Sequence, residues 1–404
     1  MNDKVLIVKS IWTIFIVNIG NFISLIAQVY LSKQLISQDF TIFYSGIALV
    51  NLLASPILQQ NLLLQKNFIN LIKNETNLVY YINHLFKLFI ALSFFYFLFF
   101  IFYYFYLNST MKLSFLNNIM LFLILFFTIL NLIPSCFLIS KKKYHIPAII
   151  FTVTDLIKLI CLFYFIKEIN QNNLTILFSI YFLFIFLIFI FNFIFMNKNL
   201  TNSVKKFKIY NSKSIKKTLK FLIYSLCMPL FLNTDIILAS YLFNLDDVSI
   251  YIVASTISKI TYFFFGVLFS IIFNEFSFQK KTKSGFIYFY LFIIIFFSIF
   301  LFLTSDYIVY FLYDKKYETA TSTVKYLIPA FALISLINIL SNILFSKENF
   351  KFIFLFFLHF LILLISTLNF ASNVLIFSKI FLSVSISLFV FISLNYYTKT
   401  YDKS

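Results

Sequence analysis

The chain has 404 residues, of which 62% are hydrophobic and only 11% are charged, and its formal net charge is +18. A soluble domain has about 25% charged residues, so this composition excludes a water-soluble protein and indicates an integral membrane protein. Every basic residue is a lysine, and most lysines lie in connections between apolar segments. Lysines placed there fix membrane topology and contact anionic headgroups, so we expect no nucleic-acid partner.

Apolar segments recur along the whole chain, each close to the roughly 20 residues that cross a bilayer as a helix. They lack the alternation of apolar and polar residues that is typical of outer-membrane strands. We therefore predict an all-α polytopic membrane protein. The twelve predicted spans are residues 10–32, 40–63, 79–104, 115–139, 146–167, 174–196, 219–242, 248–273, 286–304, 324–345, 350–369 and 372–396.

The connections between these spans alternate in lysine content. The set that includes both ends of the chain holds 22 lysines, counting the adjoining Lys220 and Lys351, whereas the other set holds six. Because cytoplasmic connections are enriched in basic residues, we predict that both termini are cytoplasmic. The longest connection on the opposite side is predicted at 305–323.

A long basic loop divides the chain into halves of six spans each. We predict an N-terminal six-helix lobe at 1–197, a basic cytoplasmic linker loop at 198–218 and a C-terminal six-helix lobe at 219–404. Because six is even, both halves enter the membrane from the same side, so the repeat is parallel, with a pseudo-twofold axis along the membrane normal. Two such lobes are expected to enclose a cleft.

Short matches between the halves support this duplication. Asp39-Phe-Thr-Ile-Phe43 opens the second span, and Asp247-Val-Ser-Ile-Tyr251 opens the eighth at an offset of 208 residues. Phe137-Leu-Ile-Ser-Lys141 closes the fourth span, and Ile343-Leu-Phe-Ser-Lys347 closes the tenth at an offset of 206. The matches agree in offset, in position within the half and in membrane side.

Sequence motifs for catalysis or cofactor binding are missing from the chain. The four glycines are scattered, which excludes a glycine-rich phosphate loop, and the three histidines and three cysteines lack metal-ligand spacing. A nucleophile with a matching base cannot be identified. We therefore expect no enzyme, no cofactor and no metal site.

Polar residues form stripes on spans one, two and eight, and polar patches on span seven. The candidates for substrate contacts on these stripes are Asn21, Gln28, Asn51, Tyr251 and Tyr262. Such residues commonly join membrane helices by hydrogen bonds. We favour a hydrated cleft over this packing role because the stripes fall on spans that correspond in the two halves.

Ionisable residues at membrane depth give the sharpest site candidates, because a charge at the bilayer centre costs about 3 kcal/mol on insertion scales. They are Lys87, Lys158, Lys259, Lys379, Asp155 and Asp235. Asp155 and Lys158 are one helical turn apart and can neutralise each other. Lys259 has no acid within a turn, so it is the best candidate for a ligand contact. Asp235 could pair with Lys259, or could take up a proton or a sodium ion.

Lysines outnumber acids at this depth by four to two, which favours an anionic substrate such as a lipid pyrophosphate. Lys259, Lys158 and Lys87 are the candidate ligands of its phosphates. Lys87 and Lys379 could instead extend to the headgroups.

Three stretches carry a family resemblance. They resemble motifs of the polysaccharide transporters, or O-antigen flippases. The stretches are Asp235-Ile-Ile-Leu-Ala-Ser-Tyr-Leu followed by Asp247-Val-Ser-Ile-Tyr251, then Leu312-Tyr-Asp-Lys-Lys-Tyr317-Glu-Thr-Ala320, and Leu35-Ile-Ser-Gln-Asp39-Phe-Thr-Ile-Phe43. These transporters belong to the multidrug/oligosaccharidyl-lipid/polysaccharide (MOP) exporter superfamily. The resemblance extends over nearly the whole chain in length, span number and duplication. Glycines of the family motifs are replaced here by Thr41, Ser249 and Asp314.

The resemblance implies a flippase of the bacterial inner membrane in O-antigen or lipopolysaccharide biosynthesis. It would move an undecaprenyl-pyrophosphate-linked oligosaccharide, an O-antigen or capsule repeat unit, by alternating access. The partners implied are this lipid-linked oligosaccharide, membrane lipids, a polysaccharide polymerase and a chain-length regulator.

Two other functions remain open from the residues alone. A cation-coupled multidrug exporter of the same superfamily would favour deep acids over deep bases. A membrane-embedded polysaccharide polymerase or ligase would be expected to have a large periplasmic loop and functional arginines, which this sequence lacks.

Overall fold

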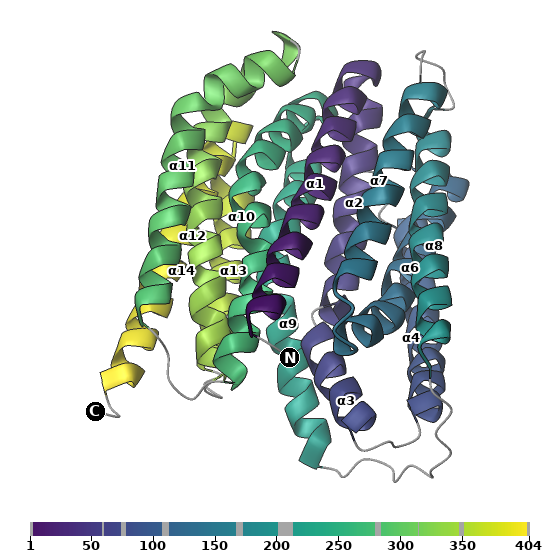
Figure 1. The fold of residues 1–404 in the computed structure, drawn as a ribbon. Helices are drawn as coiled ribbons and strands as arrows, with labels where there is room; N and C mark the ends of the chain where they lie inside the picture. The colour runs from purple at the N-terminus through teal and green to yellow at the C-terminus, as the bar shows by residue number, and fades with distance from the viewer. Residues whose placement is uncertain are drawn as a thin grey trace. The chain divides into compact units, whose positions relative to one another are not determined.

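The computed structural model describes residues 3–58, 60–73, 78–106, 113–166, 173–200, 213–278, 284–313, 315–346 and 351–401, and these form an all-helical protein (Figure 1). Ten helices in this part of the chain are long and apolar enough to cross a membrane, by length and composition. The predicted fold class is confirmed.

Each predicted span falls largely on one helix. The helices before the basic loop are α1 (Asp3–Gln34), α2 (Ser37–Leu58), α3 (Asn61–Lys73), α4 (Leu78–Tyr106), α6 (Phe115–Ser140), α7 (His145–Phe165) and α8 (Asn173–Lys198). Those after it are α9 (Lys213–Leu242), α10 (Leu245–Phe278), α11 (Ser284–Leu312), α12 (Ala320–Ser346), α13 (Lys351–Phe370) and α14 (Val374–Tyr401). A 3-10 turn, Lys315–Tyr317, precedes α12.

Helix α3 was not predicted from the sequence. The second span was expected to reach residue 63 and to lead into a loop at 64–78, but α2 ends at Leu58 and a separate helix of 13 residues follows. Leu64 and Phe68 lie four residues apart, and both are buried. The ring centroid of Phe68 is 5.5 Å from that of Tyr81 on α4 and 5.8 Å from that of Phe137 on α6. This packing holds α3 as a helix.

The predicted long connection at 305–323 is also wrong. Helix α11 continues to Leu312, and α12 begins at Ala320. Asp306 lies within α11, beyond the predicted span end at residue 304, and its carboxylate accepts a hydrogen bond of 2.8 Å from the ammonium of Lys325 on α12. Both side chains are exposed, so the charges are tolerated at the ends of two packed helices.

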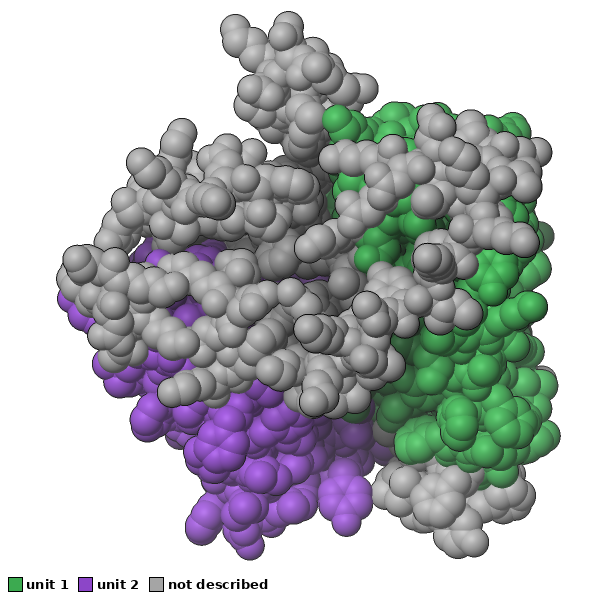
Figure 2. Space-filling model, turned by 90° about the horizontal axis from the view of Figure 1, so that it is seen from below, with its two compact units in different colours: residues 1–229 green, residues 230–404 purple. Residues whose placement is uncertain are grey.

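The chain divides into two compact units, unit 1 (residues 1–229) and unit 2 (residues 230–404), coloured green and purple in Figure 2. The division falls within α9, next to Pro229, which lies inside that helix. The predicted lobe boundaries at 197 and 219 stay predictions, because residues 201–212 of the linker lie outside the described part of the chain.

The two units share one pattern of helix packing. In unit 1, α6 packs against α2, α4 and α8, and α7 packs against α1 and α8. In unit 2, α12 packs against α10, α11 and α14, and α13 packs against α14. Phe231 of α9 adds the remaining contact, with its ring centroid 5.9 Å from that of Phe356 on α13. Each of these pairings in one unit thus has a counterpart in the other, whereas the packing of α3 on α6 is found in unit 1 alone among the described residues.

Candidate functional site: two buried ion pairs

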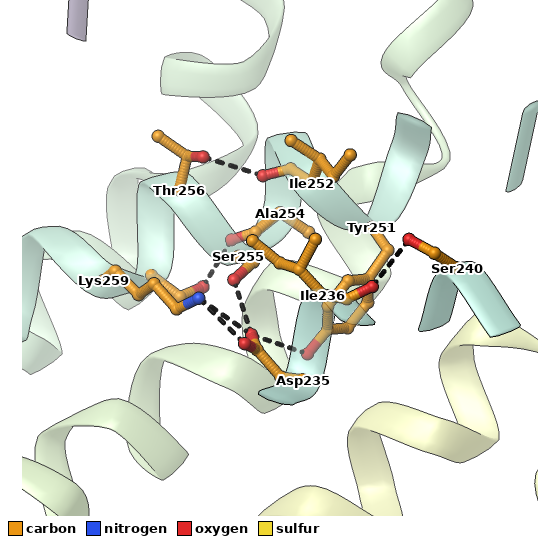
Figure 3. A network of polar contacts seen from close by, with 10 residues as sticks. Asp235, Ile236, Ser240, Tyr251, Ile252, Ala254, Ser255, Thr256 and Lys259 are labelled. Carbon is orange, nitrogen blue, oxygen red and sulfur yellow. Dashed lines mark hydrogen bonds and ion pairs between the residues drawn. The ribbon is translucent and has the colours of Figure 1, made fainter. Parts of the chain in front are cut away.

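A carboxylate with four polar contacts lies inside unit 2 (Figure 3). Asp235 on α9 is fully buried, and the ammonium of Lys259 on α10 lies 3.0 Å from each of its carboxylate oxygens. The hydroxyls of Tyr251 and Ser255 donate hydrogen bonds of 3.1 and 2.8 Å to Oδ2 of the same carboxylate. We call this group the Asp235 cluster.

Helical spacing on α10 places the three donors on one face. Tyr251, Ser255 and Lys259 follow one another at intervals of four residues, so their side chains lie along one stripe that faces α9. Few residues separate α9 from α10, and the side chain of Asn244 accepts a hydrogen bond of 2.9 Å from the backbone N–H of Asp247 at the start of α10. This cap and the short turn bring Asp235 level with the stripe.

The Asp235 cluster is electrically neutral and fully hydrogen bonded at the carboxylate. Burying a lone carboxylate or ammonium costs several kcal/mol (~3–5 when one partner of a pair is removed), but each charge here neutralises the other. The Lys259 ammonium also lies 5.2 Å from the ring centroid of Phe331 on α12. A cation is attracted to the face of such a ring, so α12 contributes to holding the lysine.

Unit 1 contains a second pair of the same kind, the Asp155 cluster. The ammonium of Lys158 on α7 donates a hydrogen bond of 2.6 Å to Oδ1 of Asp155 on the same helix, and both residues are buried. The hydroxyl of Ser24 on α1 donates a hydrogen bond of 2.9 Å to Oδ2. The Lys158 ammonium lies 4.8 Å from the ring centroid of Tyr181 on α8. Again a buried lysine is held by a carboxylate, a hydroxyl supports the carboxylate, and an aromatic ring faces the ammonium.

The other predicted site residues lie in different surroundings. Gln28 is buried on α1, Asn21 is half-buried on the same helix, and Asn51 is exposed on α2. The half-buried Tyr262 on α10 accepts a hydrogen bond of 3.0 Å from the amide of Asn338 on α12. Lys87 on α4 is exposed.

The two pairs change the interpretation of the deep charges. The sequence suggested four lysines against two acids, but the buried lysines, Lys158 and Lys259, are each neutralised by one of those acids. Lys87 and Lys379, the remaining two, are both exposed. The described residues therefore contain no fixed excess of buried positive charge. Either buried lysine can bind an anion only after its contact with the aspartate breaks.

Sequence reasoning missed the aromatic rings that face the two ammonium groups. The chain has 62 Phe and 26 Tyr residues, so nothing in the sequence distinguishes Phe331 or Tyr181 from the others. Only the packing of α12 on α10 and of α8 on α7 places these rings next to the lysines.

Comparison with known proteins gives the fold. No protein-family model and no curated protein sequence matches the chain. A solved structure of the lipid II flippase MurJ, in an inward closed conformation, matches with a TM-score of 0.69 and 14% identity over 96% of this chain and 87% of that chain. An inward-facing multidrug resistance transporter of the MATE family, MOP superfamily, matches with a TM-score of 0.67 and 11% identity over 97% of this chain and 96% of that chain.

A MOP-superfamily transporter from Pyrococcus furiosus, described as having a binding pocket of reverse polarity, matches with a TM-score of 0.58 and 12% identity over 97% of this chain and 95% of that chain. All three likenesses cover nearly the whole of this chain. The chain therefore has the fold of MOP-superfamily transporters.

Proposed function

We propose that the protein is a flippase that moves an undecaprenyl-pyrophosphate-linked oligosaccharide, an O-antigen or capsule repeat unit, across the bacterial inner membrane by alternating access. The observation that carries this proposal is the pair of buried lysines, Lys158 and Lys259, each held by a carboxylate in its own unit. The fold supports a transport role, and the similar lipid II flippase supports a lipid-linked substrate. A polysaccharide polymerase and a chain-length regulator are the partner proteins proposed with this function.

The Asp235 cluster suggests how a lysine could be exchanged between a carboxylate and a phosphate. Both partners are oxygen anions, so the ammonium of Lys259 stays paired when it moves from one to the other, whereas the carboxylate of Asp235 loses its cation and would have to take up a proton. Asp235 would keep the hydrogen bonds from Tyr251 and Ser255 after Lys259 leaves. In this mechanism the carboxylate occupies the place of the substrate phosphate in the empty state.

The Asp155 cluster provides a second cation, in unit 1. The hydroxyl of Ser24 would keep its hydrogen bond to the carboxylate when the ammonium of Lys158 binds the substrate. Lys87, which is exposed, would contact the phosphate at an earlier or later stage of transport. Asn21, Gln28, Asn51 and Tyr262 are proposed to contact sugar hydroxyls, since amide and phenol groups both donate and accept hydrogen bonds.

The structure changes the design of the mutational test. Lys259→Ala alone would leave the carboxylate of Asp235 buried without its cation, so a loss of export could reflect misfolding. The double variant Asp235→Leu/Lys259→Met removes both charges, and replacing a whole buried pair by apolar residues is often neutral for stability. We expect this variant to reach wild-type abundance in the membrane and to lose surface polysaccharide.

The exposed pair formed by Asp306 and Lys325 is the matched control. Asp306→Asn/Lys325→Gln removes one charge of each sign from unit 2, as the test variant does, and it should export polysaccharide at the wild-type level. Normal export by the folded Asp235→Leu/Lys259→Met variant would refute the role of Lys259 as a phosphate ligand.

A cation-coupled multidrug exporter is the second candidate, and one observation favours it. Transporters of the MATE family share the fold, and both buried pairs contain a carboxylate that could take up a proton or a sodium ion. This function requires Asp235 or Asp155 and not the lysines. The test is uptake of an organic cation into proteoliposomes, driven by an ion gradient. Uptake retained in Lys259→Met/Asp235→Asn would exclude Asp235 as the coupling site. Loss of that uptake in Asp155→Asn alone would favour the exporter.

A further inference from the structure

The turn between α6 and α7 contains a lysine where the backbone favours glycine. Lys142 has a φ of 60°, and it is the non-glycine residue with positive φ in the described part of the chain. Its N–H donates to the carbonyl of Ile139 at 2.8 Å, and the N–H of Lys143 donates to the carbonyl of Leu138 at 3.0 Å. These are the two bonds of a Schellman cap, whose left-handed residue is usually glycine because a side chain there is strained.

Two neighbouring lysines converge on one neutral residue at the end of α8. The Lys141 ammonium donates a hydrogen bond of 2.8 Å to the backbone carbonyl of Asn199, and the Lys143 ammonium donates to the side-chain oxygen of Asn199. Asn199 is itself fixed, because its amide donates a hydrogen bond of 2.6 Å to the carbonyl of Phe195. Two positive charges are thus held close together without a carboxylate between them.

The pKa of Lys141 reflects this surplus of positive charge. It lies below the ordinary lysine value, first because the side chain is partly buried and second because the charge of Lys143 is close. A fourth cation is at the same end of unit 1, since Lys198 ends α8 directly before Asn199. The Lys198 ammonium lies 5.8 Å from the ring centroid of Phe195.

Helix ends explain only part of this arrangement. The last carbonyls of a helix carry partial negative charge, and lysines near them are stabilised. That accounts for Lys141 and Lys143, whose ammonium groups reach Asn199 at the end of α8. It does not account for Lys142, whose side chain is exposed and makes no ion pair or hydrogen bond with a described residue.

We propose that the turn of Lys141, Lys142 and Lys143, together with Lys198, is a binding site for the phosphate of an anionic lipid headgroup. The turn joins two helices that are long and apolar enough to span the membrane, so it lies at the membrane surface. Ammonium groups form strong hydrogen bonds with phosphate oxygens, and anionic lipids attract basic segments at this depth. The ammonium of Lys142 would bind the phosphate directly. This role would account for a lysine at a position where the backbone conformation favours glycine. This site does not depend on the transported substrate.

The test uses the purified full-length protein in neutral detergent and follows thermal unfolding while lipid is added. Phosphatidylglycerol should raise the Tm of the wild type, and phosphatidylcholine should not. Lys142→Gly should raise the Tm without lipid, because the backbone strain is gone, yet bind phosphatidylglycerol about fivefold more weakly, as expected for one lysine near an anionic surface. Lys142→Asn, which also tolerates positive φ, serves as a second variant.

Two controls separate the proposed site from general charge effects. Lys142→Arg keeps the cation and should keep the lipid response, and Lys315→Gly removes an exposed lysine from the turn before α12 and should also keep it. A parallel titration with inorganic pyrophosphate identifies the source of the phosphate. If pyrophosphate competes with phosphatidylglycerol, the site also binds soluble phosphates. If pyrophosphate does not compete, the site is specific for the lipid. Unchanged phosphatidylglycerol affinity in Lys142→Gly and Lys142→Asn would overturn the proposal.

Discussion

A lysine inside a membrane protein needs an anion beside it, and in both units of this chain an aspartate provides it. Lys158 finds its partner on its own helix, whereas Lys259 finds its partner on the neighbouring helix. The two pairs also fall on helices that do not correspond between the units: α7 in one case, and α9 with α10 in the other.

The Asp155 cluster gives a prediction about stability at the scale of single residues. Lys158→Met should destabilise the protein by about 3 to 5 kcal/mol, because Asp155 is left as an unpaired buried carboxylate. Lys158→Met/Asp155→Leu should recover most of that loss. Chemical unfolding in detergent or lipid bicelles measures the difference. If the double variant is as unstable as the single variant, burial of an unpaired charge is not the cause.

Ser24→Ala is compared with the Lys158→Met and Lys158→Met/Asp155→Leu variants. It removes one hydrogen bond to Asp155 without removing a charge, so it should cost about 1 kcal/mol. A loss as large as that of Lys158→Met would mean that Ser24, and not the ion pair, holds α1 against α7.

At the scale of one element, Phe68 anchors α3 through two aromatic contacts. Phe68 is fully buried between the rings of Tyr81 and Phe137. Phe68→Ala should therefore cost about 3 to 5 kcal/mol, the usual range for a core phenylalanine. Because α3 has 13 residues, a length at which an isolated helix is marginal, its amides should also lose protection first. Hydrogen exchange of residues 61–73 measures this effect.

Ile69→Ala is the matched control for α3. Ile69 is next in sequence but only half-buried, so its removal should leave most of the protection of 61–73 in place. Equal loss of protection in both variants would show that α3 is not anchored through Phe68.

The sequence could not reveal α3 or the true length of α11 for a common reason. Hydropathy along the sequence shows where an apolar segment ends. In both places the chain stays helical beyond the polar residue that ends the apolar segment. In α3 the polar residues lie between buried Leu64 and Phe68. In α11 the interruption is Asp306, whose charge is met by Lys325 from another helix. Neither tertiary contact leaves a signal in the local sequence.

At the scale of the whole molecule, the membrane orientation is a prediction from the lysine distribution. Lys142 and Lys315 are exposed residues in turns that this distribution places on opposite sides. In a background without the three native cysteines, Lys315→Cys should react with a membrane-impermeant maleimide in intact cells. Lys142→Cys should react only after the cells are permeabilised. The reverse pattern of labelling would place both termini outside the cytoplasm.

Composition and apolar periodicity determined the all-helical fold class and the position of most spans, because in a bilayer each helix must satisfy its own backbone hydrogen bonds whatever it packs against. The division of the chain into two six-helix lobes stays a prediction. The candidate site was determined in part: Asp155 and Lys158 are one turn apart, so local spacing alone predicted their contact. Asp235 and Lys259 are 24 residues apart on two helices, and Phe331 comes from a third. Only the tertiary structure shows that Lys259 is neutralised. Its partner lies on a different helix, so the contact depends on how the helices pack and not on local sequence spacing.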